Sequence, residues 1–243
     1  IALFFVTSAV GVVTGSNSLI TVPVMFQFGI DERVAVATNM FGLTFMAVGA
    51  TIPFLRSGKL EVKLLSPLIV VTLVGSALGA ALVGVLTGSE LKLIVSVAMI
   101  VIVLFTLLGP RASGGERGNG EWSLSAVGLA ATFFLAIYGG LYSGGYVTVL
   151  TASYIAFFGM TYTQAIAETK IINIFSSAVA SAIFMWQGLV DYKLGLILAV
   201  VMFIGAYIGA KTVTKLNDLW LKRIFLSTVL ILAVKTIFDF VLN

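Results

Sequence analysis

The fold of this chain is decided by the stretch from Ile1 to Phe28, IALFFVTSAV GVVTGSNSLI TVPVMFQF. Two apolar segments, residues 1–13 and 19–28, flank the polar, glycine-containing sequence TGSNS at residues 14–18. Each segment is too short to cross a ~30 Å hydrocarbon core alone, because a crossing takes about 20 helical residues. The pattern therefore predicts either one kinked span or a re-entrant hairpin whose tip lies at mid-depth.

A second stretch of the chain has the same organisation. The apolar segment 124–137 leads into GGLYSGG at residues 139–145, and a second apolar segment follows at 146–158. Aligning the sequence with itself places residues 15–80 on 145–210 without a gap, with 18 identities in 66 positions. A self-similarity of this kind indicates an internal duplication. We expect a first repeat at 1–109 and a second at 123–243, joined by the polar linker 110–122.

The composition indicates an integral membrane protein surrounded by lipid. Of the 243 residues, 60% are hydrophobic and 10% are charged, against roughly 25% charged residues in soluble domains, and the mean hydropathy is +1.14. The net charge of +4 is too small and scattered for a nucleic-acid binder. Six further segments are long enough to span a membrane: 34–54, 62–86, 91–108, 162–186, 194–213 and 219–242.

The chain has no histidine and no cysteine. This excludes zinc and iron–sulfur sites, disulfides, and Ser-His or Cys-His catalytic groups. We therefore expect a protein that is not an enzyme and that uses no cofactor and no metal.

Basic residues separate the two interpretations of the broken segments, because they concentrate on the cytoplasmic side of a membrane protein. If both broken segments are hairpins, nine basic residues share one side against three on the other; if both are full spans, the division is six against six. The hairpin model gives three crossings per half, so the second half is inverted relative to the first. The predicted fold is an all-α membrane protein with an inverted repeat, each half a re-entrant broken-helix hairpin plus three transmembrane helices. The nine residues are Arg56, Lys59, Lys63, Arg111, Arg117, Lys211, Lys215, Lys222 and Arg223, and the three are Arg33, Lys92 and Lys193.

Inverted repeats with discontinuous helices are typical of alternating-access transporters. Backbone groups at a break must face protein, water or a ligand, and the helix that starts there carries a partial positive charge that attracts anions. The alternative is that the small residues at the breaks only permit tight packing. We expect a substrate between the breaks, held by Gly15, Ser16, Asn17, Ser18, Gly144, Gly145 and Tyr146.

The helix after each hairpin adds polar groups to this candidate site. In the first half these are Thr38 and Asn39, and in the second Thr169, Lys170 and Asn173. Lys170 is eight residues into its predicted helix, ~12 Å deep, where an ionisable side chain is costly and marks a functional candidate. The alternative is that Lys170 extends to the cytoplasmic interface. Glu168 is a candidate for proton coupling or for a structural contact.

These motifs resemble the sulfite exporter TauE/SafE family of bacterial membrane transporters. The resemblance is carried by the glycine-containing break, by Pro23, and by Gly29 with AVATN at 35–39, which Gly145, Gly159 and AIAET at 165–169 repeat. It implies an exporter of a small sulfur-containing anion such as sulfite, a sulfonate or sulfoacetate, in the bacterial inner membrane. Many members have a run of glycines at the first break, where this chain has TGSNS.

Three other functions compete with a secondary transporter. A passive anion or small-solute channel also uses half-helices that meet at mid-membrane, but the Asn-Pro-Ala signature of water channels is absent. An intramembrane enzyme lacks histidine and paired deep carboxylates. A packing subunit of a larger complex would carry no flux. The small-xxx-small pairs Gly75/Gly79 and Gly205/Gly209, which let transmembrane helices pack closely, do not determine an oligomeric state; a homodimer is one arrangement compatible with them.

Overall fold

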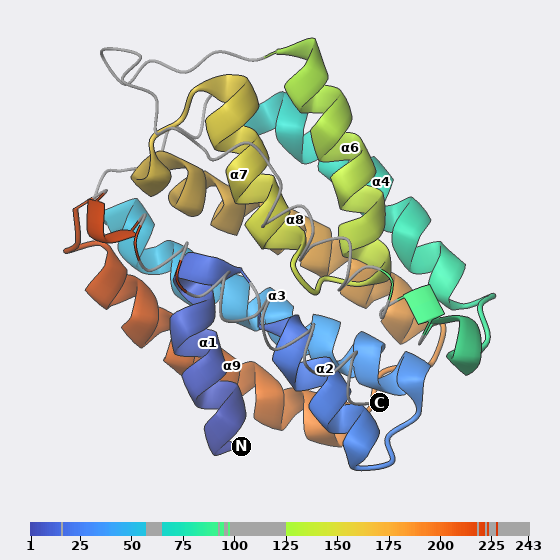
Figure 1. The fold of residues 1–243 in the computed structure, drawn as a ribbon. Helices are drawn as coiled ribbons and strands as arrows, with labels where there is room; N and C mark the ends of the chain where they lie inside the picture. The colour runs from blue at the N-terminus through green and yellow to red at the C-terminus, as the bar shows by residue number, and fades with distance from the viewer. Residues whose placement is uncertain are drawn as a thin grey trace.

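The structure, a computed structural model, describes residues 1–15, 17–56, 65–91, 93–94, 97, 125–217, 219–221, 223 and 227. The regular elements in this part of the chain are helices (Figure 1). They are α1 (Ala2–Thr14), α2 (Ser18–Gln27), α3 (Glu32–Arg56), α4 (Ser66–Val83), α6 (Ala126–Leu141), α7 (Tyr146–Phe158), α8 (Tyr162–Trp186) and α9 (Tyr192–Val213).

Four of these helices, α3, α4, α8 and α9, are long and apolar enough to cross a membrane. This confirms the expected all-helical membrane protein. The predicted spans 91–108 and 219–242 lie almost entirely outside the described residues, and the linker 110–122 lies wholly outside them.

Polar caps explain where three of the long helices begin. Asp31 accepts hydrogen bonds from the backbone N–H groups of Arg33 and Val34 at the start of α3, at 3.0 and 3.2 Å. Thr161 forms a capping box with the third residue of α8, and Asp191 accepts from the N–H of the third residue of α9 at 3.0 Å. Such caps satisfy amides that have no partner inside the helix. The helices α3 and α8 begin and end at equivalent positions of the sequence repeat.

The breaks separate α1 from α2 and α6 from α7. Gly15 ends α1 with a φ of 67°, and Gly145 precedes α7 with a φ of 73°, values that favour glycine. Neither α2 nor α7 has a side-chain cap at its start. The helix α7 folds back along α6, because the Phe158 ring at its end lies over Gly128, near the start of α6.

The helices pack as two bundles that do not coincide with the two halves of the sequence (Figure 1). The α3 bundle contains α1, α2, α3 and α9, and the α8 bundle contains α4, α6, α7 and α8. Each bundle thus takes one long helix from the other half of the chain. The contacts also repeat: α3 packs on α9 as α8 packs on α4, and α1 packs on α9 as α6 packs on α4. The main helix–helix contact between the bundles is that of α3 with α8.

Glycines bring the exchanged helices close to their new neighbours. A Cβ at Gly79 of α4 would overlap the carbonyl oxygen of Ile137 in α6, and a Cβ at Gly209 of α9 would overlap that of Ala9 in α1. Gly79 and Gly209 occupy equivalent positions of the repeat, and each follows another glycine, Gly75 or Gly205, by four residues. Small residues four apart allow transmembrane helices to pack closely. The glycines therefore stabilise the exchanged packing in both bundles.

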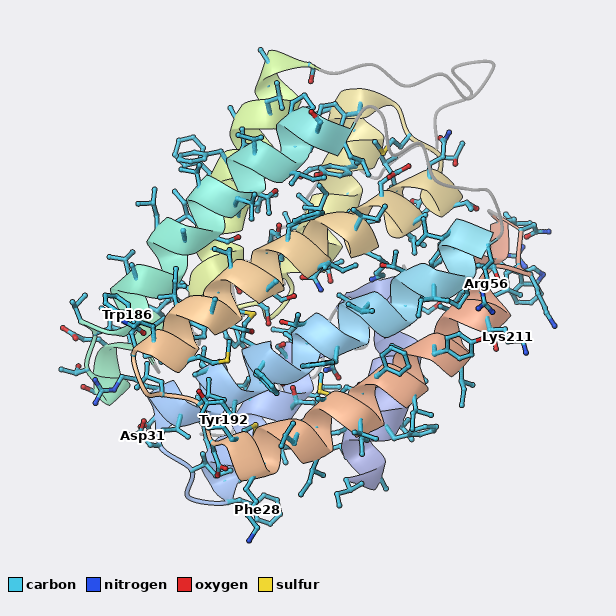
Figure 2. The ribbon with its side chains drawn as sticks, turned by 180° about the vertical axis from the view of Figure 1, so that it is seen from behind. Phe28, Asp31, Arg56, Trp186, Tyr192 and Lys211 are labelled. Atoms are coloured by element: carbon cyan, nitrogen blue, oxygen red, sulfur yellow. The ribbon has the colours of Figure 1, made fainter. Side chains whose placement is uncertain are left out.

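Residues at the two ends of the molecule show in which direction each long helix runs. Asp31, Trp186 and Tyr192 lie toward one end, whereas Arg56 and Lys211 lie together at the opposite end (Figure 2). The helices α3 and α9 therefore run in the same direction, and α8 runs against them. The basic residues Arg56 and Lys211, which the positive-inside argument assigned to one side, share an end of the molecule.

Candidate functional site

The two breaks meet in the interior of the molecule. The hydroxyl oxygens of Ser18 and Ser143 lie 2.6 Å apart. The Tyr142 hydroxyl donates to the carbonyl oxygen of Ser18 at 3.1 Å, and the Thr148 hydroxyl donates to the carbonyl oxygen of Thr14. Backbone groups that the helix breaks leave exposed are in this way paired across the two breaks, as buried polar groups require.

Gly15 lies close against the start of α7. A Cβ at this position would lie 2.7 Å from the Cβ of Val147 and 2.8 Å from the backbone nitrogen of Thr148. Glycine is therefore required here twice, for its positive φ and for the space that α7 occupies. The sequence repeat places the αL glycine Gly145 at the equivalent point of the second break.

A pocket that is partly open to solvent lies beside the meeting point of the breaks. It combines residues of both breaks with one face of α3 and one face of α8. The lining residues are Gly11, Gly15, Asn17, Ser18, Leu43, Met46, Ala47, Ala50, Ser143, Val147, Lys170 and Asn173. The structure therefore brings five of the predicted site residues, Gly15, Asn17, Ser18, Lys170 and Asn173, into a single cavity.

Lys170 is the cationic side chain of this pocket. Only 4% of its surface is exposed, and it lines the pocket instead of reaching a helix end. Among the described residues, no carboxylate pairs with it. A buried cation without a partner loses its hydration and gains no compensating attraction. An anion in the pocket would supply that attraction.

Asn17 also has unused hydrogen-bonding capacity. Its side chain is 3% exposed, and neither its amide nitrogen nor its amide oxygen finds a partner among the described residues. Leaving a buried polar group unsatisfied costs about 1–3 kcal/mol. Lys170 and Asn17 belong to different bundles, and both line the same cavity. A ligand that accepts hydrogen bonds from both would lie between the bundles.

Other predicted residues have structural contacts nearby and do not line the pocket. Asn39 donates to the Ser18 hydroxyl and accepts from Thr21, both at 2.8 Å. The Thr169 hydroxyl lies 3.3 Å from that of Thr151, and this pair occupies the positions of the second repeat that are equivalent to Thr21 and Asn39. The hydroxyl of Thr38 accepts from the backbone N–H of Asp191 at 3.0 Å.

The remaining predicted residues lie behind the breaks. The Tyr146 ring packs against Gly139 of α6, and Glu168 is fully buried in α8. Gly144 and Gly145 are buried in the second break but do not line the pocket. Ser16 lies outside the described residues.

The pocket also contains residues that the sequence did not indicate. Ser143 stands in the GGLYSGG run, where the local pattern does not distinguish it from its neighbours, and it is the residue that contacts Ser18. The apolar wall consists of Leu43, Met46, Ala47 and Ala50 of α3. These four stand at positions i, i+3, i+4 and i+7 of one helix face, a signal that is visible in the sequence but is also typical of ordinary packing.

The family model of the sulfite exporter TauE/SafE matches residues 1–236 of the chain. The chain belongs to the TauE/SafE family. The resemblance noted in the sequence is therefore confirmed, and this TauE/SafE protein is a multi-pass membrane transporter.

Curated relatives of this TauE/SafE chain are similar over nearly their whole length. A probable membrane transporter protein of Haemophilus influenzae is 24% identical over 235 residues, which are 97% of this chain and 92% of the relative. The probable membrane transporter protein ORF9 of a Sinorhizobium species is 24% identical, with coverage of 97% and 90%. The probable membrane transporter protein YfcA of Escherichia coli K12 is 25% identical over 240 residues, with coverage of 98% and 89%. No solved structure matches the chain significantly.

Proposed function

We propose that this TauE/SafE protein is a secondary transporter that exports a small sulfur-containing anion, such as sulfite, a sulfonate or sulfoacetate. The observation that carries the proposal is the pocket in which Lys170 and Asn17, both buried and both lacking partners among the described residues, face the same cavity. An oxyanion accepts hydrogen bonds from an ammonium and an amide, and such charge-assisted bonds are short and strong. The choice of a sulfur anion and the outward direction rest on the name of the family.

The proposed topology is an inverted repeat with two re-entrant hairpins in the bacterial inner membrane, and both chain ends outside the cytoplasm. Three observations support it. Residues 32–56 and 162–186 form helices that run in opposite directions. The helix α7 returns along α6. Arg56 and Lys211 share one end of the molecule, which the positive-inside rule assigns to the cytoplasm. The repeats 1–109 and 123–243 stay our assignment, and a homodimer stays a prediction.

The test is anion flux in proteoliposomes that contain the purified protein. We expect saturable flux of sulfite or sulfoacetate that depends on its gradient, and none of choline or of a neutral sugar. Lys170→Ala and Asn17→Ala should each reduce the flux, whereas Lys193→Ala, an exposed cation at the start of α9, should leave it unchanged. Unchanged anion flux in both pocket variants would contradict the proposed site, and a non-saturating conductance would identify a passive channel.

A further inference from the structure

We propose that the two bodies which move during transport are the α3 bundle and the α8 bundle, and not the two halves of the sequence. The inference rests on the proposed function, since it assigns the moving parts of that transporter. In a repeat transporter, one repeat or bundle rocks against the other around a fixed site. Here the repeats and the bundles are different sets of helices, because α4 packs with the second half of the chain and α9 with the first.

Packing inside each bundle is tight and crosses the boundary between the sequence halves. In the α3 bundle, Gly42 of α3 is so close to α9 that a Cβ there would lie 3.1 Å from the Cβ of Leu198. In the α8 bundle, a Cβ at Gly79 of α4 would overlap the backbone of α6. Close-packed interfaces of this kind do not slide continuously, because the backbones interlock. Each bundle therefore moves as one unit that contains helices from both halves.

The interface between the bundles includes one close approach, that of Gly15 to Val147 and Thr148 of α7. It contains the pocket, and its polar contacts among the described residues are few hydrogen bonds between hydroxyl and carbonyl groups. One of them joins the hydroxyls of Thr44 in α3 and Ser181 in α8 at 3.1 Å. Neutral hydrogen bonds contribute little net energy each. They can therefore break and re-form during a transport cycle.

The Thr44–Ser181 contact lies on the Trp186 side of the pocket. Ser181 is eight residues beyond Asn173 along α8, or ~12 Å toward Trp186 at 1.5 Å per residue. Thr44 lies between the pocket residues Leu43 and Met46, at the Trp186 end of the pocket wall on α3, which runs away from that end. An opening of the pocket toward Trp186 therefore requires Thr44 and Ser181 to separate.

The ligand would couple the two bodies. Asn17 and Ser18 reach the pocket from the α3 bundle, and Lys170, Asn173 and Ser143 reach it from the α8 bundle and its break. Neither bundle holds the complete set of polar groups. An anion bound between them therefore contacts both bodies, and its presence changes the balance between their relative positions.

Disulfide locking distinguishes bundles from halves, and the native chain lacks cysteine. The variant Thr44→Cys/Ser181→Cys joins the two bundles, whereas Gly42→Cys/Leu198→Cys joins two helices of the α3 bundle. Both pairs start on α3 and both connect the first half of the sequence to the second. We expect oxidation to reduce sulfoacetate flux at least tenfold in the first variant, with recovery on reduction, and to change it less than twofold in the second; sulfoacetate is used because sulfite cleaves disulfides.

The other outcomes contradict the inference. Loss of flux in both oxidised variants would show that the sequence halves move, and retention of flux in the first would show that Thr44 and Ser181 need not separate. The reduced form of each variant is its own control for folding. Formation of the disulfide is verified by the change in electrophoretic mobility after cleavage between the halves.

A distance measurement decides the question even if the protein moves no sulfite. Spin labels at Phe28 and Trp186 report on the two bundles, and labels at Phe28 and Tyr192 report on the α3 bundle alone; the three side chains are 81%, 88% and 52% exposed. In lipid, we expect a sulfoacetate-dependent or bimodal distance for the first pair and one narrow distance for the second. A single unchanging distance for the first pair, or equal changes in both, would overturn the inference. Absent flux with a bimodal first distance would contradict only the proposed substrate.

Discussion

Ser18 and Ser143 are 125 positions apart in the sequence, yet their hydroxyl oxygens lie 2.6 Å from each other. Each belongs to a break that interrupts an apolar segment, and the two breaks come from different bundles. The same Ser18 hydroxyl also accepts from Asn39. The contact therefore links both helix breaks to the first long helix and holds the polar groups of the pocket in place. What the pocket lacks among the described residues is an acceptor for Lys170 and a partner for Asn17.

Replacement of Lys170 by methionine should weaken anion binding strongly without harming the fold. The buried cation supplies the attraction to an anion, and truncation of one partner of a buried charge pair costs about 2–5 kcal/mol, or roughly 30-fold or more in Kd. The same change removes a buried cation that has no carboxylate partner, so the melting temperature should stay equal or rise. Sulfite Kd from calorimetry and Tm in detergent measure the two effects. Lys211→Met, on an exposed helix end, is the control, and a Tm that falls by several degrees in Lys170→Met would indicate a structural role.

Asn17→Ala should affect mainly anion binding, whereas Asn39→Ala should affect mainly stability. The amide of Asn17 has no partner among the described residues, so its removal should leave Tm nearly unchanged and weaken anion binding by about 1 kcal/mol, or roughly fivefold. Asn39 makes two buried hydrogen bonds, so its removal should lower Tm through a loss of about 1–3 kcal/mol. Equal losses of Tm in the two variants would argue against a ligand-binding role for Asn17.

Gly79→Ala should separate α4 from α6. The new methyl group would overlap the carbonyl oxygen of Ile137, and overpacking of this kind costs about 1–3 kcal/mol. Gly195→Ala in α9 is the matched control, because its methyl group would meet only side chains, at 3.1 Å or more, and alanine favours the helix. We expect a clear drop of Tm for the first variant and a change near zero for the second. Similar values in both would show that the close approach is not needed for stability.

The sequence predicted the helices well where polar residues mark their ends. The span 162–186 has the bounds of α8, because Thr161 caps its start and Gly188 follows its end with a positive φ. The segment 124–137, in contrast, continues as α6 to Leu141. The glycines that follow it look like a break, but Gly139 and Gly140 lie inside α6, and they are glycine because the Tyr146 ring and the backbone of α4 occupy the space beside them. That neighbour is not visible in a local pattern.

The polar part of the pocket was predictable and its geometry was not. Asn17, Lys170 and Asn173 are conspicuous because they interrupt apolar segments, and all three line the cavity. The place of Tyr146 at the start of α7 predicts a pocket residue, yet its ring packs on Gly139, since a position on a helix does not fix where a side chain points. The exchange of α4 and α9 between the bundles has no signal in hydropathy, because every long helix is apolar on several faces.

Gly15→Ala should disturb the meeting point of the breaks more than its backbone conformation alone explains. Gly15 and Gly29 have φ values of 67° and 75°. The left-handed conformation therefore destabilises alanine at either position by a similar amount, roughly 1–2 kcal/mol. At Gly29 a Cβ meets nothing within 4 Å, whereas at Gly15 it would lie 2.7 Å from Val147 and 2.8 Å from the backbone of Thr148. Gly29→Ala should therefore lower Tm modestly and leave anion flux intact. Gly15→Ala should lower Tm further and reduce flux, because α7 must retreat and take Ser143 away from Ser18. If the two variants behave alike in both measurements, the contact between the breaks does not position the pocket.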